Sequence, residues 1–291
     1  MKKLRYAPVF LALLLTLLLV GCGHKSSTPK IYTSFYPVYD FTKKIAGDDL
    51  EVVNLTPPGV EAHDFELDAR TMAELGDAKL VFAIGLHMEP WLESAEKNFP
   101  EVRFVKLSDG LATHEIDGMT DPHVWLSFEN AKKMAETIAD ELSQAMPEKA
   151  KDFRARKDGF VAELAALQAD YIEHTADLTD RTLVVTHAAF GYLANEIGFT
   201  QVPIEGLGSE TEPDAATMRR VIDYVKAHEI PVIYAAEALS PKTAETVSRE
   251  TGAAVRILDP IENLDTARIE AGEDYLSVMK QNLATLLEDR R

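Results

Sequence analysis

Cysteine is almost absent from this chain of 291 residues, which contains a single one, Cys22. One cysteine excludes any disulfide within the chain. Long apolar segments are also missing, because the run at residues 9–20 is too short to cross the roughly 30 Å hydrocarbon core of a bilayer as a helix. Basic residues are scarce: 30 Lys and Arg face 48 Asp and Glu, and the resulting net charge of −18 argues against nucleic acid as a partner.

Signature motifs of enzymes are absent as well. The sequence contains no HExxH helix motif, no nucleophile elbow and no glycine-rich loop for phosphate. We therefore expect no enzymatic activity.

The N-terminus has the pattern of a bacterial lipoprotein signal. Basic residues precede the apolar run, and the run ends at the stretch LVGC, whose last residue is Cys22. This order predicts a signal peptide over residues 1–21 and a lipid-modified Cys22 at the outer face of a membrane. The alternative is a general secretory signal followed by an unpaired cysteine, which is unusual in oxidising compartments. The polar residues 22–30 suit a flexible tether between lipid and domain.

Strand-like apolar runs alternate with segments of helical periodicity from residue 31 onward, which is the pattern of βα units. Such units fill residues 31–146, and the same rhythm returns over residues 176–291. Between them, the apolar residues of the segment 147–175 recur at helical spacing, which predicts one long linker helix, with a kink possible at Gly159. We therefore predict an α/β protein with two parallel-sheet lobes, a long rigid helix joining them, and a site in the interlobe cleft.

Residue types that bind metals follow predicted strands in both lobes. His63 follows EVVNLTPPG, His123 lies in the loop after VRFVKLS, and His187 ends TLVVTH. Asp259 and Glu262 follow the last predicted strand, AVRIL. A lone histidine in a loop is most often a hydrogen-bonding or capping residue. Here, however, the carboxyl ends of parallel strands meet at the edge where such folds bind ligands. Two histidines from the first lobe, with a histidine and a carboxylate from the second, predict a tetrahedral metal site.

Two other histidines have weaker claims as ligands. His87 precedes a predicted helix, where a supporting or surface role is expected rather than ligation. His114 lies beside Glu115 and Asp117. We expect it in an ordinary solvated loop, with a transient contact to a passing cation as the alternative.

Several stretches resemble the cluster A-I family of metal-binding lipoproteins, and in particular its zinc-specific branch. The matching stretches are TSFYPVYDFTKKIAGD, LTPPGVEAHDFEL, DPHVWLS, VVTHAAFGYL, and IPVIYAAEALSPKTAETVSRETGA followed by LDPIENL. Together they extend from about residue 31 to the C-terminus, and the combination of DPHVWLS with Pro-Pro-Gly-x-x-x-His is highly specific. The family's fold has two βα lobes joined by a rigid backbone helix, in agreement with the pattern described above.

The resemblance implies both a function and a set of ligands. It makes the chain a zinc-binding lipoprotein that captures Zn²⁺ outside the membrane and delivers it to the permease of an ABC transporter, which works with a cytoplasmic ATPase. It makes His63, His123 and His187 ligands. Glu262 is expected as the fourth because it ends the pattern Asp-Pro-hydrophobic-Glu, with Asp259 or a water molecule as alternatives. The long histidine-rich loop that many zinc members carry before Asp-Pro-His is missing here.

The ligand set implied in this way favours zinc. Manganese carriers that resemble this chain have a carboxylate at the position of His187, whereas three imidazoles and one carboxylate suit zinc. A manganese-binding protein of the same fold and a metal-stabilised surface adhesin remain alternatives, while a zinc hydrolase would need an open coordination position for water. We expect an extracytoplasmic monomer, anchored to the outer face of the cell membrane or on its periplasmic side through acylated Cys22.

Overall fold

The computed structural model describes residues 30–116, 118–207, 213–237, 240–288 and 290. The predicted signal peptide, Cys22 and all of the predicted tether except Lys30 lie outside the described residues. Within the described part of the chain, no helix is both long enough and apolar enough to cross a membrane.

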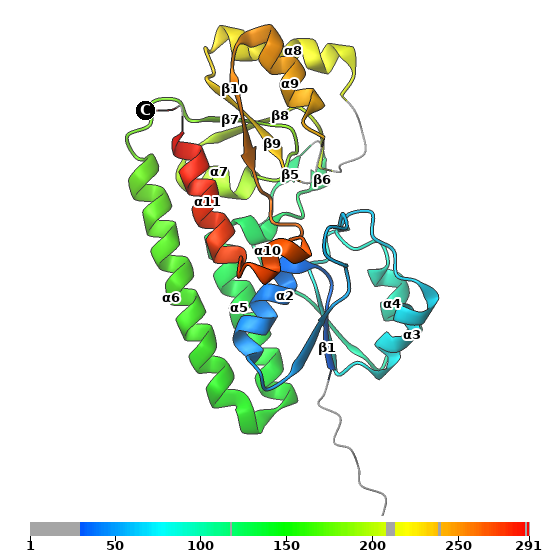
Figure 1. Cartoon of the computed structure of the whole chain (residues 1–291). Helices are drawn as coiled ribbons and strands as arrows, with labels where there is room; N and C mark the ends of the chain where they lie inside the picture. The colour runs from blue at the N-terminus through cyan, green and yellow to red at the C-terminus, as the bar shows by residue number, and fades with distance from the viewer. Residues whose placement is uncertain (1–29, 117, 208–212, 238–239, 289, 291) are drawn as a thin grey trace, which may run out of the picture.

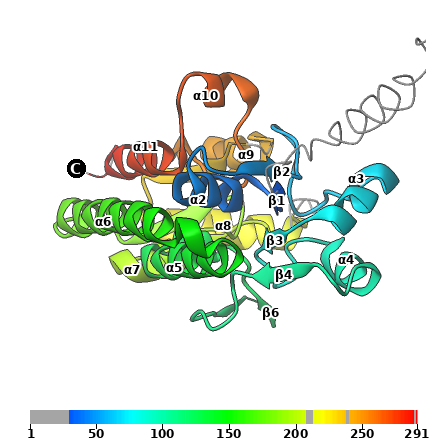
Figure 2. The ribbon, with the colours of Figure 1, turned by 90° about the horizontal axis from the view of Figure 1, so that it is seen from below.

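The first lobe is built on a four-stranded parallel sheet with the strand order β2-β1-β3-β4. All four residues of β3 are buried, as expected of an apolar strand that is covered on both faces. Helix α2 lies on one face of the sheet, and α3 and α4 lie on the other (Figures 1 and 2). The elements are β1 (Lys30–Thr33), α2 (Tyr36–Ala46), β2 (Glu51–Asn54), α3 (Ala69–Glu74), β3 (Leu80–Ala83), α4 (Leu92–Asn98) and β4 (Arg103–Lys106).

The second lobe repeats this topology with the strand order β10-β9-β7-β8, again all parallel. In each lobe the second strand of the chain pairs on one side of the first strand, and the third and fourth strands follow on the other. The elements are β7 (Thr182–Val185), α7 (Gly191–Ile197), β8 (Thr200–Pro203), α8 (Ala215–Ala227), β9 (Val232–Ala236), α9 (Lys242–Thr251) and β10 (Ala254–Leu258). The predicted fold class is therefore confirmed, and in both sheets the strand order reverses beside the first strand of the lobe, which is the point where such folds bind ligands.

Three long helices run side by side along the two lobes: α5 (Phe128–Ala145), α6 (Ala150–Thr175) and α11 (Tyr275–Leu287) (Figure 1). The predicted linker helix is present as α6, preceded by a 3₁₀ turn at Pro147–Lys149, and it continues through Gly159. Its buried face consists of the apolar residues at helical spacing, Phe153, Phe160, Leu164, Leu167 and Tyr171, together with Thr175.

One apolar core extends through both lobes. The ring of Phe41 on α2 contacts Phe160 on α6 at 5.0 Å between centroids and Tyr275 on α11 at 4.8 Å, both edge-to-face. The hydroxyl of Tyr171 on α6 donates a hydrogen bond of 2.6 Å to the carbonyl of Met279 on α11. The C-terminal helix thus packs against a helix of the first lobe, which ties the lobes together. The lobe boundaries given above remain a prediction.

Four short elements near the site were not predicted. They are the antiparallel strands β5 (Glu115–Ile116) and β6 (Met119–Thr120), a 3₁₀ turn at Val124–Leu126, and helix α10 (Thr266–Glu270). None of the four belongs to the repeated alternation of strands and helices, and a two-residue strand or a single helical turn has too few positions for a hydrophobic period to be recognised.

Candidate metal centre

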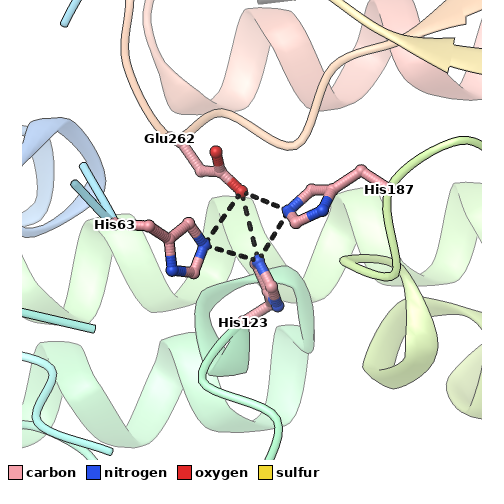
Figure 3. A group of neighbouring side chains, drawn as sticks. All are labelled: His63, His123, His187 and Glu262. Carbon is pink, nitrogen blue, oxygen red and sulfur yellow. Dashed lines mark hydrogen bonds and ion pairs between the residues drawn. The ribbon is translucent and has the colours of Figure 1, made fainter. Parts of the chain in front are cut away.

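Four of the side chains predicted from the sequence meet between the lobes: His63, His123, His187 and Glu262 (Figure 3). One possible ligand atom of each lies within 4.8 Å of the others. His63 lies in the loop after β2, and His123 directly precedes the 3₁₀ turn at Val124–Leu126. His187 follows β7, and Glu262 lies in the loop after β10. The group therefore combines two residues from each lobe.

The spacing of the four ligand atoms suits a four-coordinate metal ion. Nε2 of His123 lies 3.2 Å from Nε2 of His63 and 3.0 Å from Nε2 of His187. Oε1 of Glu262 lies 2.9 Å from Nε2 of His187 and 3.1 Å from Nε2 of His123. Its distance to Nε2 of His63 is longer, at 3.7 Å. Zinc–nitrogen bonds of about 2.0–2.1 Å separate two ligands of a tetrahedron by about 3.3 Å. The observed separations lie on both sides of this value, so one ion fits among the four atoms.

The centre is shielded from solvent on most sides. His123, His187 and Glu262 retain only 0%, 1% and 4% of their accessible surface. His63 is the most accessible of the four, with 11% of its side chain exposed. It borders a cavity of about 520 Å³ that is also lined by Leu86, His87, Gly118, Met119, Thr120, Pro122 and Leu207. His63 is therefore the ligand candidate that faces the approach from solvent.

Asp121 holds the imidazole of His123. Its Oδ1 accepts hydrogen bonds from the backbone N–H of His123 at 3.0 Å and from the ring Nδ1 at 2.7 Å. With Nδ1 as the donor, Nε2 of His123 carries a free lone pair and points at the other three ligand candidates. A carboxylate that fixes the tautomer and the ring orientation in this way is a common support of metal-binding histidines.

The loop that carries Glu262 is held by several hydrogen bonds. Trp125 donates its indole N–H to the carbonyl of Pro260 at 2.8 Å, and Asp259 Oδ1 accepts the backbone N–H of Ile261 at 2.7 Å. Ile261 is fully buried and has a positive φ of 59°, a conformation that is strained for a β-branched residue. The loop thus accepts local strain in the conformation that directs Glu262 into the centre.

Asp259, the alternative fourth ligand, is not part of the group. Its Oδ2 lies 2.8 Å from Nη1 of Arg268, and the same guanidinium contacts Glu237 at 3.0 Å and Glu273 at 2.8 Å. Both oxygens of Asp259 are therefore engaged within its own loop and with Arg268. The structure brings Glu262, and not Asp259, to the three histidines.

The electrostatics of the group favour a bound cation. Burial alone would raise the pKa of Glu262, but its interactions with the three imidazoles hold it well below the usual range. Burial lowers the pKa of His123, yet hydrogen bonds to Asp121 and Glu262 more than reverse this and raise it above 6.5. Burial lowers the pKa of His63 as well, but its combined interactions with the carboxylates of Glu262 and Glu61 outweigh burial and raise it. A metal ion can replace the protons that these imidazoles attract.

Sequence reasoning missed two residues around the centre and gave a third, His114, a different environment. Asp121 could have been found, because it lies two residues before His123 in Asp-Pro-His. Glu61 is partly buried and its Oε1 accepts the backbone N–H of His63 at 3.2 Å. His114 was expected in a solvated loop, and this was wrong: its side chain is only 27% exposed, and Nε2 lies 2.9 Å from Oδ2 of Asp121. His87 is exposed at the surface. A surface position was one of the two roles expected for it.

Two α/β lobes of the same strand order, enclosing a buried group of three imidazoles and one carboxylate, define a two-lobed binding protein with a candidate metal centre in its cleft. The chain belongs to the family described as zinc-uptake complex component A, periplasmic, whose model matches residues 31–289. This finding confirms the resemblance seen in the sequence.

Individual relatives agree with this assignment. The zinc-binding lipoprotein AdcA of Streptococcus pneumoniae is 36% identical over 98% of this chain, which spans 60% of the length of AdcA. The Zn(II)-bound ZnuA-like domain of AdcA superposes with a TM-score of 0.81 at 35% identity, covering 91% of this chain and 99% of the domain. The high-affinity zinc uptake system protein ZnuA of Bacillus subtilis is 32% identical over 97% of both chains.

A further solved structure is that of the laminin-binding protein Lmb of Streptococcus agalactiae. It superposes with a TM-score of 0.84 at 28% identity and covers 91% of this chain and 100% of Lmb. Lmb is described as a bifunctional protein with adhesin and metal transporting activity.

Proposed function

We propose that this protein captures Zn²⁺ outside the cytoplasm and delivers it to the permease of an ABC transporter, which a cytoplasmic ATPase drives. The observation that carries the proposal is the convergence of His63, His123, His187 and Glu262 on one buried point between the lobes. The names of AdcA and ZnuA, both described as zinc proteins, support it.

The donor set supports zinc over manganese. Zinc takes four nitrogen and oxygen ligands in a tetrahedron, whereas manganese prefers more oxygen-rich sites. Three imidazoles and one carboxylate oxygen, with His123 about 3 Å from each of the other three ligand atoms, match the first description. Copper(II) also binds such ligands tightly, so the metals available outside the cell select the physiological cargo.

Binding rather than catalysis follows from the number of ligands. A hydrolytic zinc site keeps one coordination position for water. Four protein ligands around one ion fill the tetrahedron and leave no position at which water is activated. Zinc is therefore the cargo of this site and not a catalytic cofactor.

Attachment to the membrane completes the proposal. An acylated Cys22 would tether the two lobes to the lipid bilayer, at the outer face of the cell membrane or on the periplasmic side. The named lipoprotein AdcA supports this location. A tethered monomer would stay close to its permease, which raises the effective concentration of the delivered metal at the transporter.

Growth under zinc limitation tests the proposal. A strain that lacks the gene should grow poorly in medium with a zinc chelator, and it should recover when zinc, but not manganese, is added. The intact gene should restore growth, whereas a His187→Ala gene should not. Recovery with manganese alone would favour the manganese alternative. Normal growth combined with lost attachment to a laminin-coated surface would favour an adhesin, the second activity described for Lmb.

A further inference from the structure

Asp121 is a fully buried carboxylate with a histidine on each side. Its Oδ1 accepts the hydrogen bonds from His123, and its Oδ2 lies 2.9 Å from Nε2 of His114. The contact of Oδ2 with His114 is polar but is not a well-aligned hydrogen bond, and Oδ2 accepts no such bond from any described residue. A buried carboxylate without compensation is unfavourable, and His114 is the polar side chain that faces this oxygen.

The second lobe shapes the space in which His114 and Asp121 meet. A Cβ atom on Gly191 would lie 2.6 Å from Nε2 of His114 and 3.2 Å from Oδ2 of Asp121, so only glycine leaves room for this contact. The ring of Tyr192 lies against the imidazole of His114 at 4.0 Å between centroids. The Tyr192 hydroxyl donates a hydrogen bond of 2.7 Å to the carbonyl of Asp121. Both partners are therefore held from α7.

Backbone contacts fix the pair from the first lobe as well. The N–H of Asp121 donates a hydrogen bond of 2.9 Å to the carbonyl of His114, at the base of the β5–β6 hairpin. His114 also borders a cavity of about 280 Å³ that is lined by Gly191, Asn195 and Gln201, among other residues. A series of contacts from His123 through Asp121 to His114 thus leads from the buried centre to the rim of this cavity.

We propose that His114 is a positioning residue of the zinc site, a role that rests on the proposed zinc-binding function. By occupying Oδ2, His114 keeps Asp121 in the orientation in which Oδ1 accepts the Nδ1–H of His123. That hydrogen bond in turn directs Nε2 of His123 at the metal. Without His114, the carboxylate of Asp121 is free to turn toward another donor, and His123 loses the partner that sets its tautomer.

Zinc affinity of the detergent-extracted full chain tests this role, with chelator competition as the assay. His114→Leu removes the imidazole N–H but keeps an apolar contact to Tyr192, whereas His114→Gln keeps an N–H donor at similar reach. Gly191→Ala leaves His114 in the chain but displaces it. His228→Leu is the matched control, because His228 also stacks on a tyrosine, Tyr224, at 4.0 Å, but lies exposed at the end of α8.

We expect His114→Leu and Gly191→Ala to weaken zinc binding by about tenfold, near the lower end of the effects of residues that support metal ligands. His114→Gln should retain most of the affinity, and His228→Leu should match the wild type. With Co²⁺ in place of zinc, the visible absorption of the tetrahedral ion should change in the first two variants and not in the others. Such a spectral change reports on the ligand geometry around the ion and not on folding.

Unchanged affinity and an unchanged Co²⁺ spectrum in both His114→Leu and Gly191→Ala would overturn the proposal. So would a His114→Gln variant as weak as His114→Leu. If the wild-type chain takes up no zinc, the proposed function itself fails. If the wild type binds zinc and the variants bind it equally well, only the role of His114 fails.

Discussion

Arg268 and Asp259 form an ion pair with a separation of 2.8 Å, and this contact holds Asp259 away from the three histidines that Glu262 reaches. The two carboxylates lie in one loop, three residues apart, yet they have different partners. We therefore expect Glu262→Gln to weaken zinc binding by more than the roughly 10–100-fold typical of residues that only support ligands. Asp259→Asn should have a small effect, because its amide oxygen can still accept the backbone N–H of Ile261.

Isothermal titration of the two variants beside the wild type measures this difference. A silent Glu262→Gln together with a severe Asp259→Asn would show that the fourth ligand is Asp259.

Zinc affinity should fall as the solution becomes more acidic. Imidazole must be neutral to bind a metal, and the pKa values of His63 and His123 are raised above 6.5, so protons compete near neutral pH. Each imidazole that protonates lowers the affinity by about tenfold per pH unit below its pKa. Glu262 does not contribute in this range, because its pKa lies well below the usual value and it stays ionised.

Competition with a chelator at several values between pH 8 and 5.5 measures the dependence. An affinity that stays constant across this range would mean that imidazoles do not hold the metal.

Helix α6 offers a test of the fold that does not involve the metal. Gly159 is exposed within this continuous helix, and a Cβ atom there would meet no other atom within 4 Å. Gly159→Ala should therefore raise the free energy of unfolding by about 0.5–1 kcal/mol, since glycine is a poor helix former. Gly198→Ala is the control of opposite sign, because Gly198 ends α7 with a positive φ of 71° that alanine adopts at a penalty. Urea denaturation of the metal-free protein measures the free energy of unfolding of both variants. A Gly159→Ala variant less stable than the wild type would contradict an unbroken helix with this face exposed.

The proposed anchor depends on one thiol. Cys22→Ala should leave the protein unacylated, because no other cysteine is present in the chain. The variant should appear in the soluble fraction and should still bind zinc, since all four ligand candidates lie in the two lobes. Fractionation of cells followed by immunoblotting compares it with the wild type. If the variant sediments with membranes to the same extent, the lobes are held there by something other than a lipid on Cys22.

The alternation of strands and helices predicted the two parallel lobes because it recurs along the whole of each lobe, although each strand has only four or five residues. The same pattern predicted three ligand candidates, since His63, His123 and His187 follow strands whose carboxyl ends face the cleft. The choice between Asp259 and Glu262 could not be made from position alone. It depends on Arg268, nine residues farther along the chain, whose side chain engages Asp259.

Contacts between distant segments were the least predictable part. No local pattern indicates that Tyr275 packs against Phe41, or that Gly191 leaves space for His114 beside Asp121. His114 was expected in solvent because short polar loops usually lie there, and the two-residue strands that bring it back toward the centre are too short to be recognised in a sequence. These tertiary contacts decide which residues support the site.

Anomalous scattering at the zinc edge from a crystal of the zinc-loaded protein tests the central claim most directly. We predict one strong peak between the lobes, about 2.0–2.2 Å from Nε2 of His63, His123 and His187 and from a carboxylate oxygen of Glu262. A crystal that shows no anomalous peak among these four side chains, or shows its zinc only elsewhere, would contradict it.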